Sequence, residues 1–131
     1  MAATDAGPDA RPDRKSFTLI SRQAPYGTDG AQICLELALA AAVYEQRVNY
    51  LFVEDGVYQL LGPQQPDAIA SKNLLAALQA LEVYGVDTVY VHRHSLESRG
   101  LAVTDLALEV ELVDDEQVTR LVREADMVFS L

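Results

Sequence analysis

Short apolar runs alternate with stretches of helical periodicity along this chain, and the alternation constrains its fold more than any other feature. Five runs have the length and the β-branched or aromatic content of strands: 17–21, 48–53, 86–92, 106–113 and 127–131. Between them the spacing predicts helical segments at 29–44, 57–61, 71–84, 96–99 and 114–125. Strands joined through helices form right-handed crossovers and lie parallel in one sheet. The pattern predicts an α/β fold, a single-domain three-layer sandwich whose mostly parallel five-stranded sheet has helices on both faces.

The chain has 131 residues, which is the usual length of a single domain. Residues 1–15 are rich in Ala, Asp and Pro and are predicted to form a disordered tail, so that the folded domain covers 16–131. Polar residues at the predicted helix starts are candidate N-caps. These are Thr28 or Asp29, Ser71, Ser95, and Asp114 or Asp115.

The charge balance argues against a nucleic-acid binder. Twenty acidic residues against ten Lys and Arg give a net charge of −10, whereas binding to phosphates needs a basic face. Residues 105–131 hold eight of the acids and only two arginines. This excess is either a solvated helix face or a docking surface for a basic partner.

Cysteine and histidine content is low. A single cysteine, Cys34, cannot form an internal disulfide, and His92 and His94 lack a third ligand nearby, so we expect neither a metal site nor a cofactor. The sequence has no apolar run near the ~20 residues of a membrane span, and its first residues do not match a signal peptide. The expected location is the cytoplasm.

Cys34 is the only strong nucleophile in the sequence. It lies inside the first predicted helix between Ile33 and Leu35, with no basic residue close by in that helix. A reactive cysteine needs a lowered pKa and some exposure. The setting predicts a buried, inert thiol; the alternative is a persulfide carrier.

Three loops follow the carboxyl ends of predicted strands, where open α/β sheets place their ligands. In the first loop, Tyr26 and Gly27 belong to a turn that matches no phosphate-binding motif, which favours a shaped turn at a subunit contact over a phosphate or flavin site. In the second, Asp55 follows Glu54, and a helix-capping or loop-stabilising role is favoured over acid–base or metal chemistry. Tyr58, close behind, has the amphipathic ring typical of interfaces.

The third loop gathers polar and basic side chains in an otherwise acidic protein. His92, Arg93, His94 and Arg99 can bind an anion or orient the thiolate of a partner. In the alternative interpretation Arg93 and Arg99 pair with Glu97 or Asp105 on the surface.

Three loop motifs and the chain end together resemble one family. The residues are 24–28 (APYGT), 55–61 (DGVYQLL), 95–101 (SLESRGL) and 126–131 (DMVFSL). In order and placement they are similar to the DsrF/TusC branch of the DsrE/DsrF sulfur-relay proteins. The resemblance covers nearly all of 17–131 and implies a mostly parallel α/β sandwich.

The resemblance also implies partners. Such proteins assemble with DsrE/TusD-like and DsrH/TusB-like subunits into heterohexamers that pass persulfide sulfur to a DsrC/TusE-like acceptor. The principal sulfur-accepting cysteine of the family belongs to the DsrE/TusD subunit, and no residue here matches its position. We therefore expect a non-catalytic subunit of a sulfurtransferase complex, with Tyr26, Gly27, Asp55, Tyr58, His92, Arg93, His94 and Arg99 as candidate partner contacts.

The loop motifs favour the DsrF type, which serves intracellular sulfur oxidation. The alternatives are a TusC-type subunit in tRNA 2-thiouridine synthesis and an independent, flavodoxin-like binder of a small ligand at the 26–30 loop.

Overall fold

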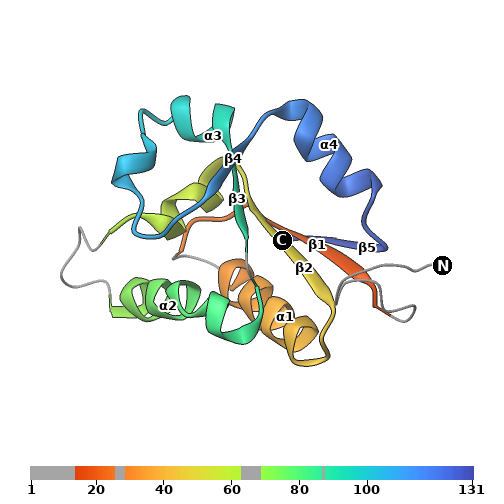
Figure 1. Cartoon of the computed structure of the whole chain (residues 1–131). Coiled ribbons are helices and arrows are strands. Elements are labelled where there is room, and N and C mark those ends of the chain that lie inside the picture. The colour runs from red at the N-terminus through yellow and green to blue at the C-terminus, as the bar shows by residue number, and fades with distance from the viewer. Residues whose placement is uncertain (1–13, 26–28, 63–68, 87) are drawn as a thin grey trace.

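A computed structural model describes residues 14–25, 29–62, 69–86 and 88–131 and shows one parallel sheet (Figure 1). Its strands run in the order β4-β3-β2-β1-β5, and every neighbouring pair is parallel. The strands are β1 (Ser16–Ser21), β2 (Arg47–Phe52), β3 (Val89–His92), β4 (Glu111–Val113) and β5 (Met127–Ser130). The predicted parallel α/β sheet is confirmed.

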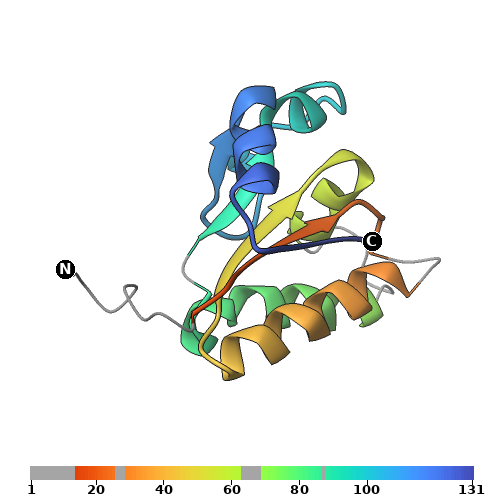
Figure 2. The same ribbon diagram turned by 90° about the vertical axis from the view of Figure 1, so that its right-hand side faces the viewer.

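Helices cover both faces of the sheet, as predicted for a sandwich. Figures 1 and 2 show α1 and α2 along one face, with α3 and α4 on the other. The helices are α1 (Gly30–Val43), α2 (Ile69–Gln79), α3 (Arg93–Glu97) and α4 (Asp115–Arg123), with 3-10 turns η2 (Glu54–Leu60), η3 (Leu81–Tyr84) and η4 (Val103–Asp105).

The predicted strand at 106–113 was too long, because only Glu111–Val113 pairs in the sheet. Residue 106 instead forms an isolated antiparallel bridge with Leu61, and the amide of Ala107 donates to the Leu60 carbonyl at 2.8 Å. Leu106 and Leu108 pack against the core from outside the sheet. Large apolar residues stand at every second position from 106 to 110, which is the spacing of a strand, so periodicity alone does not separate a strand from this segment.

The boundary between the third predicted strand and the helix before it also differs from the prediction. Gly85 adopts a left-handed backbone with φ of 98°, and the amide of Val86 bonds back to the Leu81 carbonyl, so β3 starts only at Val89. The predicted helix 71–84 is split into α2 and η3.

The predicted caps have mixed outcomes. Asp114 caps α4, since its carboxylate accepts the Gln117 amide at 2.8 Å while the Gln117 side chain accepts the Asp114 amide. Asp29 precedes α1 without a side-chain cap bond. Ser71 is not a cap, because α2 begins at Ile69 and contains it. Thr28 lies outside the described residues.

The dense core lies between the sheet and α1. Tyr50 and Phe52 of β2 stack with ring centroids 4.6 Å apart, and both are fully buried. Small residues on α1 let the helix approach this aromatic pair closely. They are Ala31, Cys34, Ala38, Ala41 and Ala42.

One close backbone approach joins the carboxyl ends of β1 and β2. A Cβ on Gly56 would lie 2.0 Å from the Ser21 carbonyl oxygen, so no other residue fits there. The same carbonyl accepts the Val53 amide at 3.1 Å. The contact fixes η2 directly against the end of β1, at the edge where the candidate site lies.

Candidate functional site

A pocket of about 610 Å³ opens at the carboxyl ends of the strands, between the sheet and α4. The strand β2 lies on one side of β1, and β5, the last strand of the chain, lies on the other side of β1. The pocket therefore lies at the switch point of the strand order. Its size is ordinary for a small-ligand or side-chain site. Its walls consist of Ile20, Arg22, Val53, Glu54, His92, His94, Ser95, Ser98, Arg99, Asp115, Val118, Thr119 and Ser130.

A chain of hydrogen bonds crosses the pocket wall and joins three elements. His92 Nε2 lies 2.5 Å from Asp115 Oδ1, and His92 Nδ1 lies 2.7 Å from Ser95 Oγ. Ser95 Oγ also accepts the backbone amide of Glu54 at 2.8 Å. These bonds link α4, the end of β3 and the start of η2 through one imidazole ring. The ring orientation is thereby fixed.

Ser95 was predicted to cap the helix after β3, and that prediction is wrong. Its helix, α3, begins at Arg93 with His92 as the N-cap, which places Ser95 inside the helix. Ser95 is buried, and its hydroxyl forms hydrogen bonds with the Glu54 amide and the His92 ring. The Arg99 guanidinium donates to the Ser95 carbonyl at 3.1 Å and holds the same turn from the other side.

Glu54 has a backbone φ of 52°, an uncommon value for a residue with a side chain. Its amide is held by Ser95, and its carboxylate pairs with Arg22 at 3.2 Å. Strained residues held by their surroundings cluster at functional sites. At the pocket edge, the contacts of Glu54 with Ser95 and Arg22 therefore hold the backbone in an unfavourable conformation.

The two adjacent carboxylates do not act together. Asp55 pairs with Arg99, with Oδ1 3.0 Å from Nη2, while Glu54 pairs with Arg22. The favoured loop-stabilising role is thus observed, although as ion pairs, since Val53 is the N-cap of η2. The partner of Arg99 is Asp55, not the predicted Glu97 or Asp105.

The remaining candidate residues are scattered. Tyr26 and Gly27 lie outside the described residues. Tyr58 is half-buried in η2, Arg93 is exposed on α3, and His94 is exposed and lines the pocket. The rings of His92 and His94 lie 6.0 Å apart between centroids. Of the predicted set, the structure brings His92, His94 and Arg99 to the pocket.

Cys34 is fully buried, as predicted. Burial raises the pKa of its thiol, and the nearby hydroxyls of Tyr50 and Ser21 offset only part of that rise. Successive strand residues point to opposite faces, so Ser21 faces Cys34 and α1 while Ile20 faces the pocket. The sheet therefore separates the only thiol of this chain from the pocket.

Sequence reasoning missed two members of the hydrogen-bond chain. Asp115 was considered only as a cap, and Ser95 likewise, because their contact partners lie 23 and 41 residues away. Within the described ranges the structure shows no group of three metal-ligating side chains. The same residues contain no helix long and apolar enough to span a bilayer.

Comparison with known proteins identifies relatives along most of the chain. The model of the DsrE/DsrF-like family matches residues 15–131. A protein of Pseudomonas aeruginosa named TusC homolog is 42% identical over 117 residues, covering 89% of this chain and 98% of its own. The intracellular sulfur oxidation protein DsrF of Allochromatium vinosum is 41% identical, covering 88% of this chain and 96% of its own.

A solved structure supports the fold. The crystal structure of the ychN protein from E. coli superposes with a TM-score of 0.73 and covers 89% of this chain and 99% of its own. Sequence identity between the two is 22%, so this likeness concerns the fold alone.

Proposed function

Because this chain belongs to the DsrE/DsrF-like family, we propose that it is a subunit of a multi-subunit sulfur-relay complex that carries no sulfur itself. The burial of Cys34 is the observation that supports this role most strongly. A persulfide carrier needs an accessible thiolate, and here burial disfavours the thiolate and covers the sulfur. Catalytic thiols of the relay therefore belong to partner chains.

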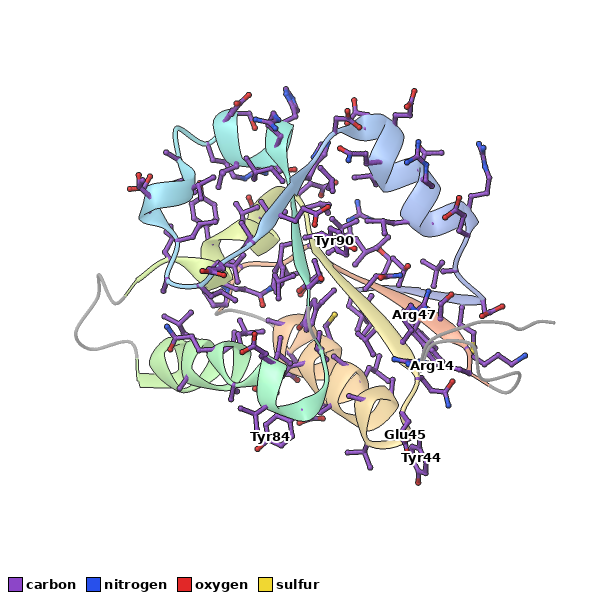
Figure 3. All side chains as sticks on the ribbon, viewed as in Figure 1. Arg14, Tyr44, Glu45, Arg47, Tyr84 and Tyr90 are labelled. Carbon is purple, nitrogen blue, oxygen red and sulfur yellow. The ribbon has the colours of Figure 1, made fainter. Side chains whose placement is uncertain are left out.

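The proposed partners are DsrE/TusD-like and DsrH/TusB-like subunits in a heterohexamer, with a DsrC/TusE-like protein as sulfur acceptor. Large exposed apolar side chains at one end of the α1 face support an assembly role. Tyr44 is 77% exposed and Tyr84 53% exposed, and both project away from the sheet in Figure 3. Val43 and Val83 extend this surface.

The pocket-edge residues are further proposed contacts. Arg93, His94 and Tyr58 lie on segments that flank the pocket and reach the surface. The Tyr26 loop is proposed to contribute as well. The complex is proposed to work in the cytoplasm.

Intracellular sulfur oxidation is the proposed pathway, supported by the relative named DsrF and by the motifs at Tyr58 and 90–101. The relative named TusC homolog, of nearly equal identity, favours a second candidate, sulfur delivery for tRNA thiolation. Deleting the gene separates them. Loss of growth on stored sulfur with normal 2-thiouridine content supports the first candidate, and loss of 2-thiouridine supports the second.

Native mass spectrometry of the full chain, alone and co-expressed with its genomic neighbours, tests the assembly. A heterohexamer containing DsrE-like and DsrH-like chains is expected. Tyr44→Asp should lower the fraction assembled, whereas Glu97→Gln, exposed on α3, should assemble as the wild type does. A monomer or homodimer that does not bind the products of the neighbouring genes contradicts the proposal and supports the alternative of a small-ligand binder.

A further inference from the structure

We propose that the pocket between the sheet and α4 receives a persulfide-bearing side chain of a partner subunit, and that His92 exchanges a proton with the sulfur there. This inference rests on the proposed sulfur-relay function. It adds a site, a ligand class and a proton-exchanging residue on a chain whose own thiol is buried.

The position of the pocket is the first support. It lies at the switch point of the strand order, where open α/β sheets bind their ligands, and its volume of about 610 Å³ accommodates a side chain. Part of the lining is apolar, from Ile20, Val53 and Val118, which suits the weakly hydrated sulfur. His92 belongs to the same lining.

The charge arrangement argues for a ligand with little net charge. Both arginines of the pocket have carboxylate partners, Arg22 with Glu54 and Arg99 with Asp55. A phosphate or sulfate would have to break these pairs. A persulfide, which carries at most one diffuse negative charge, needs only the imidazole beside it.

The thiol must come from another chain. Cys34 is the single cysteine of this sequence, and the sheet lies between it and the pocket. Among the described residues, the lining of the pocket therefore has hydroxyl, carboxylate, guanidinium and imidazole groups but no cysteine. A site that lacks its own nucleophilic sulfur yet holds an oriented imidazole suits a sulfur supplied from outside.

The hydrogen-bond chain engages both ring nitrogens of His92, but the partner of Nε2 is an exposed carboxylate. Ser95 Oγ has two lone pairs, so it can accept both the Glu54 amide and His92 Nδ1–H. His92 Nε2 then points to Asp115, whose side chain is 91% exposed and can turn into water. The His92 side chain is 16% exposed, so the incoming sulfur can reach Nε2 once Asp115 turns away.

The transfer balances with His92 holding one proton. The acceptor thiolate attacks the outer sulfur of the donor persulfide; a new sulfur–sulfur bond forms, and the bond within the donor breaks with its electron pair left on the donor sulfur. Nε2–H of the imidazolium protonates that leaving thiolate. The free Nε2 then takes the proton of the next acceptor thiol. A persulfide and a thiol become a thiol and a persulfide, without net oxidation.

The first test uses the full chain and sodium hydrosulfide, the smallest thiol probe, at constant pH and ionic strength. The two histidines of this sequence give resolvable ring signals by nitrogen-15 NMR. The expected result is a saturable shift of the His92 ring nitrogens with little change at His94. Asp115→Asn, a change at an exposed side chain, should alter the response. No shift at His92, or equal shifts at both rings, overturns the inference.

The second test separates this inference from the proposed function. In the co-expressed complex, His92→Gln should leave assembly intact by native mass spectrometry but slow persulfide transfer about 100-fold, the usual contribution of general acid–base catalysis. Glu97→Gln is the control.

A complex that assembles and transfers sulfur equally fast with His92→Gln refutes the pocket role and leaves the proposed function standing. Failure of the wild-type chain to assemble refutes the proposed function instead. If His92→Gln does not fold, the hydrosulfide titration of the wild-type chain decides, because the absence of a saturable shift at the His92 ring also contradicts the inference.

Discussion

The two faces of the sheet are built differently. The face under α1 and α2 is packed with fully buried side chains, among them Tyr50, Phe52 and Leu78. On the face under α3 and α4, Leu51 and Thr18 of the central strands are buried, but of residues 101–131 only Val113 is buried. Val128 of the edge strand β5, which lies beside Thr18 on this face, is 39% exposed. The first face holds the core, and the second holds the pocket, the ion pairs and most of the acidic excess.

This difference shows how a small domain can be both stable and able to bind. Stability needs one face with a dense apolar layer. The other face then tolerates strained backbone, buried hydroxyls and exposed apolar residues, as seen at Glu54, Ser95 and Val128. Residues that determine function are expected on this second face. Substitutions on the two faces should therefore differ in their effect on stability.

The largest predicted contrast compares one leucine from each face. Leu78→Ala, at a fully buried site on α2, should lower the free energy of unfolding by about 3 kcal/mol because it leaves a cavity. Leu121→Ala, at a half-buried site on α4, should cost only about 1 kcal/mol. Urea denaturation measures both. Equal losses would show that the second face is as well packed as the first.

Ser95→Ala should be the most damaging polar substitution on the pocket face. It leaves the Glu54 amide without its acceptor and frees the His92 ring, at an expected cost of about 2 kcal/mol. Ser98→Ala, three residues along and exposed, should change stability by less than about 0.5 kcal/mol. Urea unfolding of the two variants measures this difference. A mild effect of Ser95→Ala would show that contacts other than the Ser95 hydroxyl hold the Glu54 backbone.

Tyr50→Phe should raise stability on the core face. The Tyr50 hydroxyl is buried and finds no strong hydrogen-bond partner within the described part of the chain; it interacts only weakly with the Cys34 thiol. Removing it relieves a desolvation cost of about 1 kcal/mol while the stacking on Phe52 is kept. An increase in the urea midpoint with an unchanged slope is expected. A decrease would reveal a contact that the hydroxyl makes in solution.

A smaller effect is expected at alkaline pH. Burial raises the pKa of Cys34 and of Tyr50 in the folded state, so the folded protein keeps protons that the unfolded chain releases. Stability should be unaffected below the ordinary thiol value of 9.0 and fall as pH rises above it. Tyr50→Phe should reduce this fall. Identical alkaline profiles in the wild type and Tyr50→Phe would contradict a raised pKa of Tyr50 in the folded state.

The sequence predicted the first face better than the second. Helical spacing around Cys34 and the apolar content of 48–53 are local signals, and they placed α1, β2 and the buried thiol correctly. The pocket depends on contacts between distant residues, such as Glu54 with Ser95 and His92 with Asp115. No local pattern encodes such contacts. For the same reason the apolar alternation of 106–110 was mistaken for a strand.

We propose that this chain serves a sulfur relay without carrying sulfur. Intact-protein mass spectrometry of the co-expressed complex, after incubation with a persulfide donor, tests it most directly. We expect a partner subunit to gain the mass of one sulfur atom while this chain stays unmodified. A sulfur adduct on this chain that disappears in Cys34→Ser would contradict this role and make Cys34 a carrier.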